Sequence, residues 1–222
     1  MIDWNQIDTV LFDMDGTLLD LHYDNRVWNE LLPSHYARMH GISVDEAGQR
    51  LLDHMRAIFG SLEFYCLDYW ERHTALDIMA PHREATDLIT WRPGALEFLR
   101  AIRATGRPAV LVTNAHRRSI NIKQTHSRIV DELDLTVSSH DVGYPKEATG
   151  FWLAVQDLHP FDPARTLFID DNAEVLHAAR RYGIGHIVTI AQPDSARPVR
   201  TDLPYPAIHD FTTCMPTSRS VR

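Results

Sequence analysis

Short apolar runs recur along the chain, and segments with helical periodicity separate them. Five runs rich in β-branched residues predict strands. They span residues 9–15 (TVLFDMD), 109–114 (AVLVTN), 135–139 (LTVSS), 166–171 (TLFIDD) and 186–191 (HIVTIA). Apolar residues at almost every position are typical of strands that are buried on both faces of a sheet. Because strands and helices alternate, the pattern predicts an α/β fold with a parallel sheet.

Two segments between these strands carry the signals of capped helices. Residues 94–106 repeat apolar side chains every three or four positions and end on Gly106. A second helix is predicted to begin at Asn172, a common N-cap residue type, and to stop at Gly183. Both helices fit the alternating order of a parallel α/β sheet.

Residues 20–91 interrupt this alternation. They contain long helical patterns, such as 25–41 and 43–60, and no convincing strand. We therefore expect a helical cap inserted between two parts of an α/β core, residues 1–19 and 92–222. Because the insertion begins directly after the acidic end of the first strand, it is placed to cover a site there as a lid. The polar tail at about 212–222 is expected to be flexible.

Composition narrows the classes of function. The 222 residues are 44% hydrophobic, enough to bury a core, and the net charge of −8 argues against nucleic acid as a partner. No segment approaches the length of a membrane span and the N-terminus lacks a leader pattern, so we expect a cytoplasmic protein with no membrane partner. Cys66 and Cys214 are interpreted as ordinary thiols. The thirteen histidines show no metal-binding spacing and are interpreted as surface residues.

Acidic and polar residues stand where the predicted strands end, which is where parallel α/β sheets bind their ligands. Asp13 and Asp15 lie two positions apart in an extended segment, so both can approach one site, and carboxylates this close need a cation. The simpler alternative to a cation site is a solvated turn after the strand, with both carboxylates in water. A calcium loop of the EF-hand type fails, because its sixth position, counted from Asp13, is Leu18 rather than glycine. The other strand-end candidates are Thr113, Asn114, Asp170 and Asp171.

Four short motifs resemble those of the haloacid dehalogenase-like superfamily. They are DMDGT (13–17), LVTNA (111–115), GYPKE (143–147) and FIDDN (168–172), and they occur in the superfamily's order. The resemblance implies a Rossmann-like core with a helical cap, with Asp13 as nucleophile and Asp15 as general acid/base. It also implies that Thr113, Asn114 and Lys146 hold the phosphate of the substrate. Mg²⁺ would be held by Asp13, Asp15, Asp170 and Asp171, with Asp15 acting through its backbone carbonyl.

Physical chemistry supports these roles. A carboxylate that attacks a phosphate dianion meets strong repulsion unless a hard cation binds both groups. Attack by Asp13 would form an aspartyl-phosphate, and Asp15 would serve both half-reactions as acid and then base. Structural alternatives stay open at this point: Thr113 suits a strand in any case, Lys146 suits a surface loop, and one of the paired acids at 170 and 171 suits a helix N-cap.

Position 15 and the insertion indicate the branch of the superfamily. Dehalogenases and phosphonatases lack an aspartate there, so Asp15 favours a phosphate ester as the small-molecule substrate. DMDGTLLDLHYDN (13–25) and YCLDYW (65–70) resemble the GMP/IMP 5′-nucleotidases, which implies a purine nucleoside monophosphate. Tyr65, Tyr69 or Trp70 could stack on a base, although each also suits core packing. A sugar-phosphate phosphatase or phosphomutase is the alternative, and a silent binding module is disfavoured because every catalytic position is filled.

Overall fold

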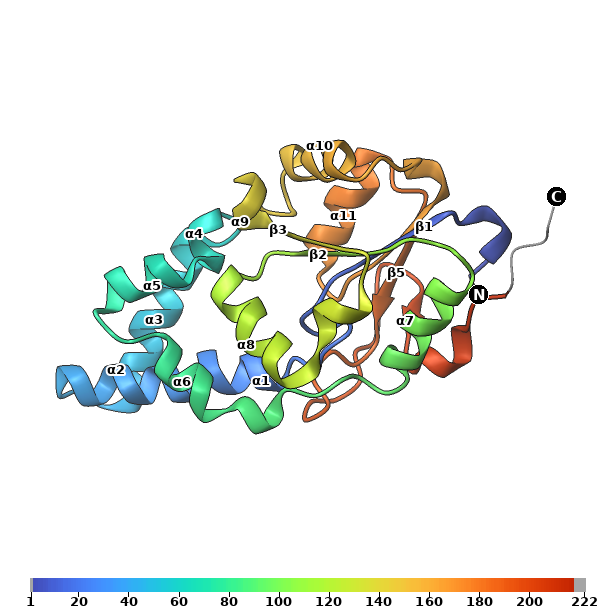
Figure 1. The fold of residues 1–222 in the computed structure, drawn as a ribbon. Helices are drawn as coiled ribbons and strands as arrows, with labels where there is room; N and C mark the ends of the chain where they lie inside the picture. Colours follow the sequence, from blue (N-terminus) through green and yellow to red (C-terminus); the bar gives the residue numbers. More distant parts are fainter. Residues whose placement is uncertain (1, 218–222) are drawn as a thin grey trace.

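A six-stranded parallel sheet forms the centre of the computed structural model, which describes residues 2–217. The strand order is β3-β2-β1-β4-β5-β6 (Figure 1). The strands are β1 (Thr9–Phe12), β2 (Ala109–Thr113), β3 (Leu135–Ser138), β4 (Thr166–Ile169), β5 (His186–Ile190) and β6 (Ala207–Ile208). The first five confirm the α/β prediction. The two-residue edge strand β6 is not predicted by the sequence pattern.

The two faces of the sheet bury different helices, because side chains alternate along each strand. Val10 and Phe12 of β1 point into a cluster with α7 (Ala95–Ala104), whereas Leu11 points to the opposite face. There it packs in a cluster with side chains of α10 (Thr149–Leu158) and α11 (Ala173–Tyr182). Figure 1 shows α10 and α11 above the sheet and α7 below it. Both faces are therefore covered, as the apolar strand sequences predict.

The helix signals in the sequence act as caps in the structure. Asn172 Oδ1 accepts the backbone N–H of Glu174 at 2.9 Å, and Gly183 follows α11 with a φ of 116°. Helix α7 ends at Ala104, two residues before Gly106, which has a positive φ as well. The remaining core helices are α8 (Arg117–Ser127) and α9 (Ser139–Val142).

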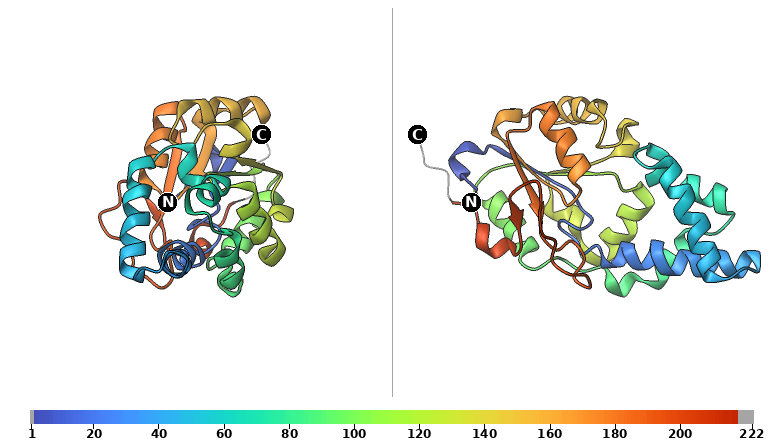
Figure 2. Two further views of the ribbon diagram at one scale, coloured as in Figure 1. Left: turned by 90° about the vertical axis from the view of Figure 1, so that its left-hand side faces the viewer. Right: turned by 180° about the vertical axis from the view of Figure 1, so that it is seen from behind.

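Helices fill the interval between β1 and α7. They are α1 (His22–Arg26), the π-helical turn Val27–Leu31, α2 (Leu32–His40), α3 (Val44–Ile58), α4 (Leu62–Tyr65), α5 (Leu67–Thr74) and α6 (Met79–Glu84). Their apolar side chains form a small core of their own around Leu32, Leu51 and Trp70. Figure 2 shows these helices gathered at one end of the molecule. We call residues 20–91 the cap from here on.

Part of the segment for which the sequence predicts a flexible tail, residues 212–222, has a defined conformation. A 3₁₀-helix spans Phe211–Cys214, and the buried Phe211 ring lies 4.9 Å from the Phe98 ring of α7. Arg107 donates a hydrogen bond to the carbonyl of Thr217 at 3.3 Å. Apolar packing of Phe211 therefore holds this segment on the core. Residues 218–222 lie outside the described residues.

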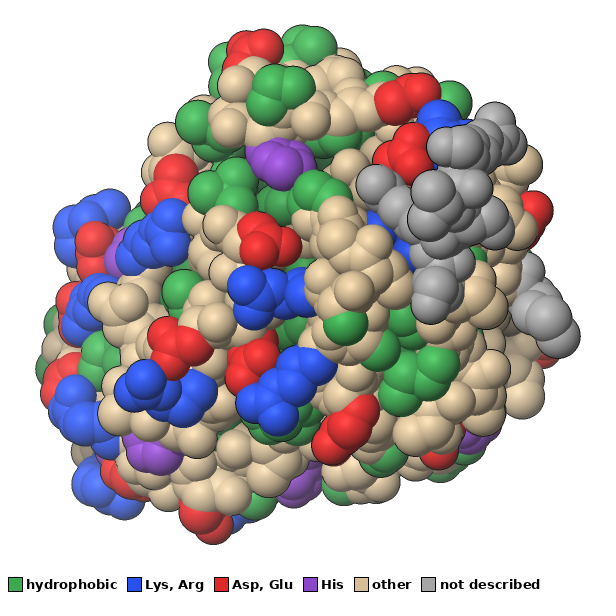
Figure 3. All heavy atoms as spheres, turned by 45° about the vertical axis from the view of Figure 1, so that its right-hand side comes forward, with side chains coloured by type: hydrophobic (Ala, Val, Ile, Leu, Met, Phe, Trp, Pro, Cys, Tyr) green, Lys and Arg blue, Asp and Glu red, His purple; other side chains and the backbone are tan. Residues whose placement is uncertain are grey.

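Charged side chains of both signs are interspersed on the surface. On the face shown in Figure 3, blue Lys and Arg side chains lie beside red Asp and Glu side chains. Exposed ion pairs of the described residues include Arg83–Asp77 and Arg128–Asp131. Among residues 2–217, no helix combines the length and apolar character needed to cross a membrane.

Candidate active site

Three aspartates meet at the carboxyl ends of neighbouring strands. Asp13 directly follows β1, and Asp170 and Asp171 directly follow β4, which pairs with β1. One carboxylate oxygen from each lies within 4.8 Å of the others. Gly16 makes room for them, because a Cβ at this position would lie 2.9 Å from Asp171 Oδ2, and its φ is +80°. The structure therefore brings these three predicted residues together.

Lys146 lies among these acids. Its Nζ contacts Asp13 Oδ1 at 2.5 Å and Asp170 Oδ2 at 2.7 Å, and the residue is 3% exposed. It belongs to the turn between α9 and α10, where its carbonyl accepts Trp152 Nε1–H at 2.8 Å. The turn is a loop, as the sequence predicts, but the lysine is a buried partner of two carboxylates and not a surface cation.

Burial and like charges raise the pKa values of the three acids. Burial raises the pKa of Asp13 well above the usual range of aspartate, although Lys146 opposes the shift. Burial and then the charge of Asp170 raise the pKa of Asp171 to about 7. Burial disfavours the charged form of Lys146, but Asp13 and Asp170 outweigh it and raise its pKa. The single positive charge of Lys146 therefore does not balance the negative charge of the three carboxylates.

This carboxylate cluster fits a magnesium ion. Mg²⁺ prefers oxygen ligands and is usually bound by one or two carboxylates, with water completing its shell. The buried negative charge that Lys146 does not neutralise would be neutralised by a dication. Asp170 already uses both oxygens, since Oδ2 accepts from Lys146 and Oδ1 accepts the backbone N–H of Asn172 at 2.8 Å.

Thr113 and Asn114 lie at the end of β2, beside the acids. Thr113 Oγ1 accepts the backbone N–H of Ala115 at 3.0 Å, so its hydroxyl proton can be donated to an anion. Asn114 Oδ1 accepts the backbone N–H of Lys146 at 2.9 Å, and its Nδ2 donates to Glu147 at 3.1 Å. The Asn114 amide therefore fixes the turn that carries Lys146, a contact that the motif alone does not reveal.

The cap reaches the same turn through Tyr65. Its hydroxyl donates to Glu147 Oε1 at 2.6 Å, and burial together with the Glu147 charge raises the pKa of Tyr65. The other two aromatic candidates pack inside the cap. Tyr69 is hydrogen-bonded to His54 at 2.7 Å, and Trp70 is fully buried in the cap core. Tyr69 therefore packs within the cap, whereas Trp70 packs there and also lines the pocket described below.

Asp15 contacts a second lysine, which the sequence analysis did not identify. Lys123 of α8 contacts Asp15 Oδ1 at 2.6 Å and Asp24 Oδ1 of α1 at 2.7 Å, and it is 1% exposed. Its Nζ also lies 5.1 Å from the centroid of the Tyr23 ring, a cation–π distance. Lys123 and Lys146 are the only lysines in the chain, and both are buried at this site. That scarcity is the sequence signal that could have identified Lys123.

A pocket lies above these residues, between core and cap. Its core wall includes Asp13, Asp15, Thr113, Lys146 and Asp171, and its cap wall includes Asn25, Trp28, Asn29, Phe64 and Tyr65. Arg200, from the segment after β5, also lines the pocket and donates to the carbonyls of Asp171 at 2.9 Å and Ile190 at 2.6 Å. The pocket thus has a charged floor and a roof of aromatic and amide side chains.

One histidine is buried and two are half-buried at the pocket or beside it, which corrects their interpretation as surface residues. His82 of α6 is 1% exposed, its Nδ1 lies 2.9 Å from the Tyr23 hydroxyl, and burial lowers its pKa to about 3. His116 lines the pocket, and its ring centroid lies 4.8 Å from that of His140. Burial lowers the pKa of His140 to about 4. These rings come together through the fold and not through spacing along the chain.

Comparisons with known proteins agree with this geometry. The family model of haloacid dehalogenase-like hydrolases matches residues 7–183. The chain belongs to this family. The GMP/IMP nucleotidase YrfG of Escherichia coli (strain K12) is 37% identical to this haloacid dehalogenase-like hydrolase over 216 residues, which are 97% of each chain. The phosphoglycolate phosphatase of Pseudomonas putida is 24% identical over 214 residues, 93% of this chain and 78% of the relative.

A solved structure shows the same fold. The crystal structure of a HAD phosphatase from Thermococcus onnurineus matches this haloacid dehalogenase-like hydrolase with a TM-score of 0.76 at 20% identity, covering 93% of this chain and 95% of that one. The Rossmann-like core implied by the four motifs is therefore present. Three motifs lie at the ends of β1, β2 and β4, and the fourth lies in the turn after α9.

Proposed function

We propose that this hydrolase removes phosphate from purine nucleoside 5′-monophosphates, with GMP and IMP preferred. The observation that carries the proposal is a pocket with Asp13, Asp171 and Lys146 on its floor and Trp28 and Asn29 in its roof. Such a floor suits a phosphate ester bound with a dication, and such a roof suits an aromatic base with a polar edge. The 37% identity to a GMP/IMP nucleotidase over 97% of both chains supports the choice of nucleotide.

Asp13 is the proposed nucleophile. Its carboxylate oxygen would bond to phosphorus while the bond from phosphorus to the ester oxygen breaks, which leaves an aspartyl-phosphate and releases the nucleoside. Asp15 would protonate the leaving oxygen. In the second half-reaction it would take a proton from the water that attacks phosphorus, and the bond to Asp13 would break to release phosphate.

Lys146 and Thr113 would hold the phosphoryl oxygens. The Lys146 ammonium lies 2.5 Å from Asp13, so its charge is already where nucleophile and phosphoryl group meet. A Mg²⁺ ion, when bound, would neutralise charge between the phosphoryl group and the carboxylates. We assign it to Asp13, Asp170 and Asp171, with Asp170 acting through a remaining lone pair or a water, and with the Asp15 carbonyl as a further ligand.

The cap is the proposed source of base selectivity, because the core contacts only the phosphoryl group that all esters share. We treat residues 20–91 as this cap domain and residues 1–19 with 92–222 as the core. Asn29 Nδ2 donates to Asn25 Oδ1 at 3.1 Å, which uses one of its two N–H groups. The second can donate to a 6-oxo group, whereas the 6-amino group of AMP cannot accept it. Asn29 is exposed in the free protein, so the penalty for AMP, roughly 1–3 kcal/mol, applies where the bound base covers the unpaired donor.

A substrate panel tests the proposal. Release of phosphate from GMP, IMP, AMP, UMP, a hexose phosphate and p-nitrophenyl phosphate is measured with Mg²⁺ and with a chelator. We expect the highest kcat/KM for GMP and IMP, and loss of all activity in the chelator. A hexose phosphate or UMP ahead of both purine nucleotides would overturn the nucleotidase assignment. Isomerised sugar phosphate without release of phosphate would favour a mutase.

Selectivity in the cap is tested with Asn29→Ala. We expect the preference for GMP over AMP to fall towards unity while turnover of p-nitrophenyl phosphate is kept. Asn121→Ala, on an exposed position of α8, is the matched control and should keep the preference. An unchanged GMP/AMP ratio in Asn29→Ala would exclude Asn29 as the donor.

A further inference from the structure

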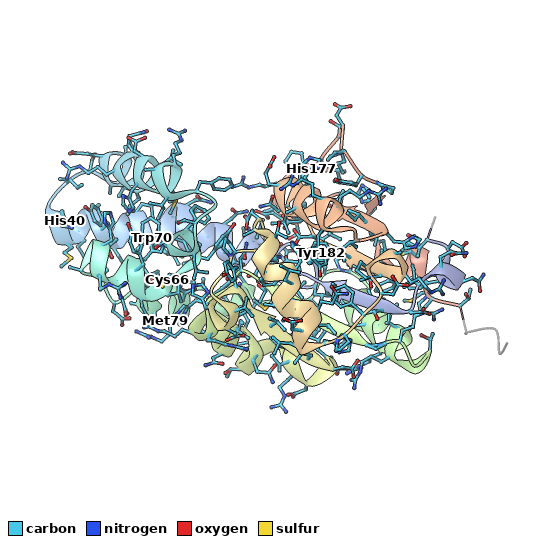
Figure 4. The ribbon with its side chains drawn as sticks, turned by 90° about the horizontal axis from the view of Figure 1, so that it is seen from above. His40, Cys66, Trp70, Met79, His177 and Tyr182 are labelled. Carbon is cyan, nitrogen blue, oxygen red and sulfur yellow. The ribbon has the colours of Figure 1, made fainter. Side chains whose placement is uncertain are left out.

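Three metal-ligating side chains meet where the cap touches the core. Cys66 follows α4 in the cap, His116 precedes α8, and His140 lies in α9. The Cys66 sulfur and one ring nitrogen of each histidine all lie within 4.8 Å of one another. Figures 1 and 2 both show α4 beside α9, and Figure 4 labels Cys66 in the cap. Sequence spacing hides this group, because its members come from three distant segments.

His140 presents a bare nitrogen to this group. Ser139 Oγ donates to the carbonyl of Asn114 at 3.2 Å, so the Ser139 hydroxyl can only accept from His140 Nδ1, 3.3 Å away. The proton of the neutral imidazole is therefore on Nδ1, and Nε2 carries a lone pair. Nε2 is buried and has no hydrogen-bond partner among the described residues. A buried lone pair without a partner is costly, and a cation would satisfy it.

His116 is oriented in a similar way. Its Nδ1 accepts the backbone N–H of Arg118 at a long 3.3 Å, so Nδ1 is the unprotonated nitrogen of the neutral ring and would exchange this long hydrogen bond for a bond to a cation. Its Nε2–H then faces Asp68 Oδ2, 3.6 Å away. A carboxylate behind the N–H of a ligating imidazole is the usual arrangement in protein metal sites, because it fixes the tautomer and raises the basicity of the other nitrogen.

We propose that Cys66, His116 and His140 bind a zinc-class dication. One thiolate and two imidazoles are donors that Zn²⁺ accepts, with water in a fourth position, whereas Mg²⁺ prefers oxygen. Bond lengths of 2.0–2.3 Å in a tetrahedral site place donors about 3.3–3.6 Å apart, so donor pairs within 4.8 Å need to close by at most about 1.2–1.5 Å. Binding releases the Cys66 proton to solvent. This site is separate from the carboxylate cluster, which offers oxygen only.

The proposed site joins the two parts of the protein. Cys66 belongs to the cap, and both histidines belong to the core. A cation held by all three therefore ties the cap down over the pocket, and its binding stabilises the folded protein by mass action. This inference does not depend on which ester the enzyme hydrolyses.

Cobalt(II) provides a direct test, because a thiolate bound to Co²⁺ gives an intense charge-transfer absorption that carboxylate ligands do not give. The full chain is titrated with Co²⁺ in excess Mg²⁺, which keeps the carboxylate cluster occupied. We expect the charge-transfer band in the wild type and no band in Cys66→Ser. In His140→Gln the affinity should fall by at least about 10-fold. Cys214→Ser, which removes the other free thiol, should keep the band.

The same variants separate binding from a loss of fold. With a chelator present, Cys66→Ser should melt at the wild-type temperature, and added Zn²⁺ should raise the melting temperature of the wild type only. A wild type that shows no band at saturating Co²⁺ would overturn the proposal. A band that survives in Cys66→Ser, or disappears in Cys214→Ser, would do the same.

Discussion

Replacing Lys123 by methionine should destabilise the protein, because the change removes the shared cation of two carboxylates. Lys123 Nζ lies 2.6 Å from Asp15 and 2.7 Å from Asp24, and the side chain is 1% exposed. Methionine keeps most of the chain length and apolar volume, so the variant tests the charge rather than the packing. The Tyr23 ring, 5.1 Å from Nζ, would keep an apolar neighbour.

The size of the effect follows from the geometry. At an effective dielectric of about 20, each ion pair contributes a gross attraction of about 6 kcal/mol, most of which offsets the burial of the charges. Removing one member of a buried pair costs about 3–5 kcal/mol. Burial and then the Asp15 charge raise the pKa of Asp24 to about 7 even beside Lys123, so without the lysine Asp24 can take up a proton. We therefore expect Lys123→Met to lower the free energy of unfolding by about 3 kcal/mol at pH 7.5 and by less at pH 6.

Urea unfolding in a chelator measures this loss. Arg128→Met is the matched control, because its ion pair with Asp131 is exposed and should contribute at most about 1 kcal/mol. In Lys123→Met with Asp24→Asn, stability should be partly restored, since the charge of Asp24 is removed together with that of Lys123, whereas turnover should stay low because Asp15 still lacks its partner. A loss of stability in Lys123→Met no larger than that in Arg128→Met would show that Lys123 does not stabilise the two carboxylates.

Three further predictions follow from single contacts. Gly16→Ala should weaken Mg²⁺ binding in calorimetry, because its Cβ would meet Asp171 at 2.9 Å; Gly41→Ala, with a similar φ and open space, should not. Lys146→Ala should abolish turnover and should lower the melting temperature measured in a chelator. Mg²⁺ should partly restore the melting temperature. An unchanged melting temperature in the chelator would contradict the buried pairing of Lys146. The pKa of His82 is lowered from 6.5 to about 3, so the unfolded chain binds the proton first and stability falls with pH below 6.5. Between pH 6.5 and pH 5, the free energy of unfolding of the wild type, measured in urea, should fall by about 2 kcal/mol more than that of His82→Gln. The same pH dependence in both proteins would contradict this prediction.

The strands and the acids at their ends are predictable from local sequence. Segments such as LFI (167–169) are apolar throughout, and strands buried on both faces need that composition. Asp13 and the pair at 170 and 171 follow such strands directly, so the parallel order of the sheet brings them to one edge. Strand β6 gives no such signal. It has two residues, and Pro204 and Pro206 precede it.

The contacts between helices are not predictable in this way. Lys123 meets Asp24 because α8 and α1 come together through the fold, and no local pattern links residues 99 positions apart. Cys66, His116 and His140 likewise come from three separate segments. Phe211 packs on α7 although the sequence around it is polar, because one large aromatic ring is enough to anchor a short segment.

Turnover of Asp13→Asn on GMP in saturating Mg²⁺ tests the central claim most directly. Asparagine has nearly the same shape as aspartate but cannot form an aspartyl-phosphate, so kcat should fall by several orders of magnitude. The fold should not suffer, because burial disfavours the charge of Asp13 more than Lys146 favours it, and Lys146 keeps Asp170 as a partner. We therefore predict an inactive protein whose melting temperature in a chelator is at least that of the wild type. A folded Asp13→Asn variant that hydrolyses GMP at a rate near that of the wild type would contradict it.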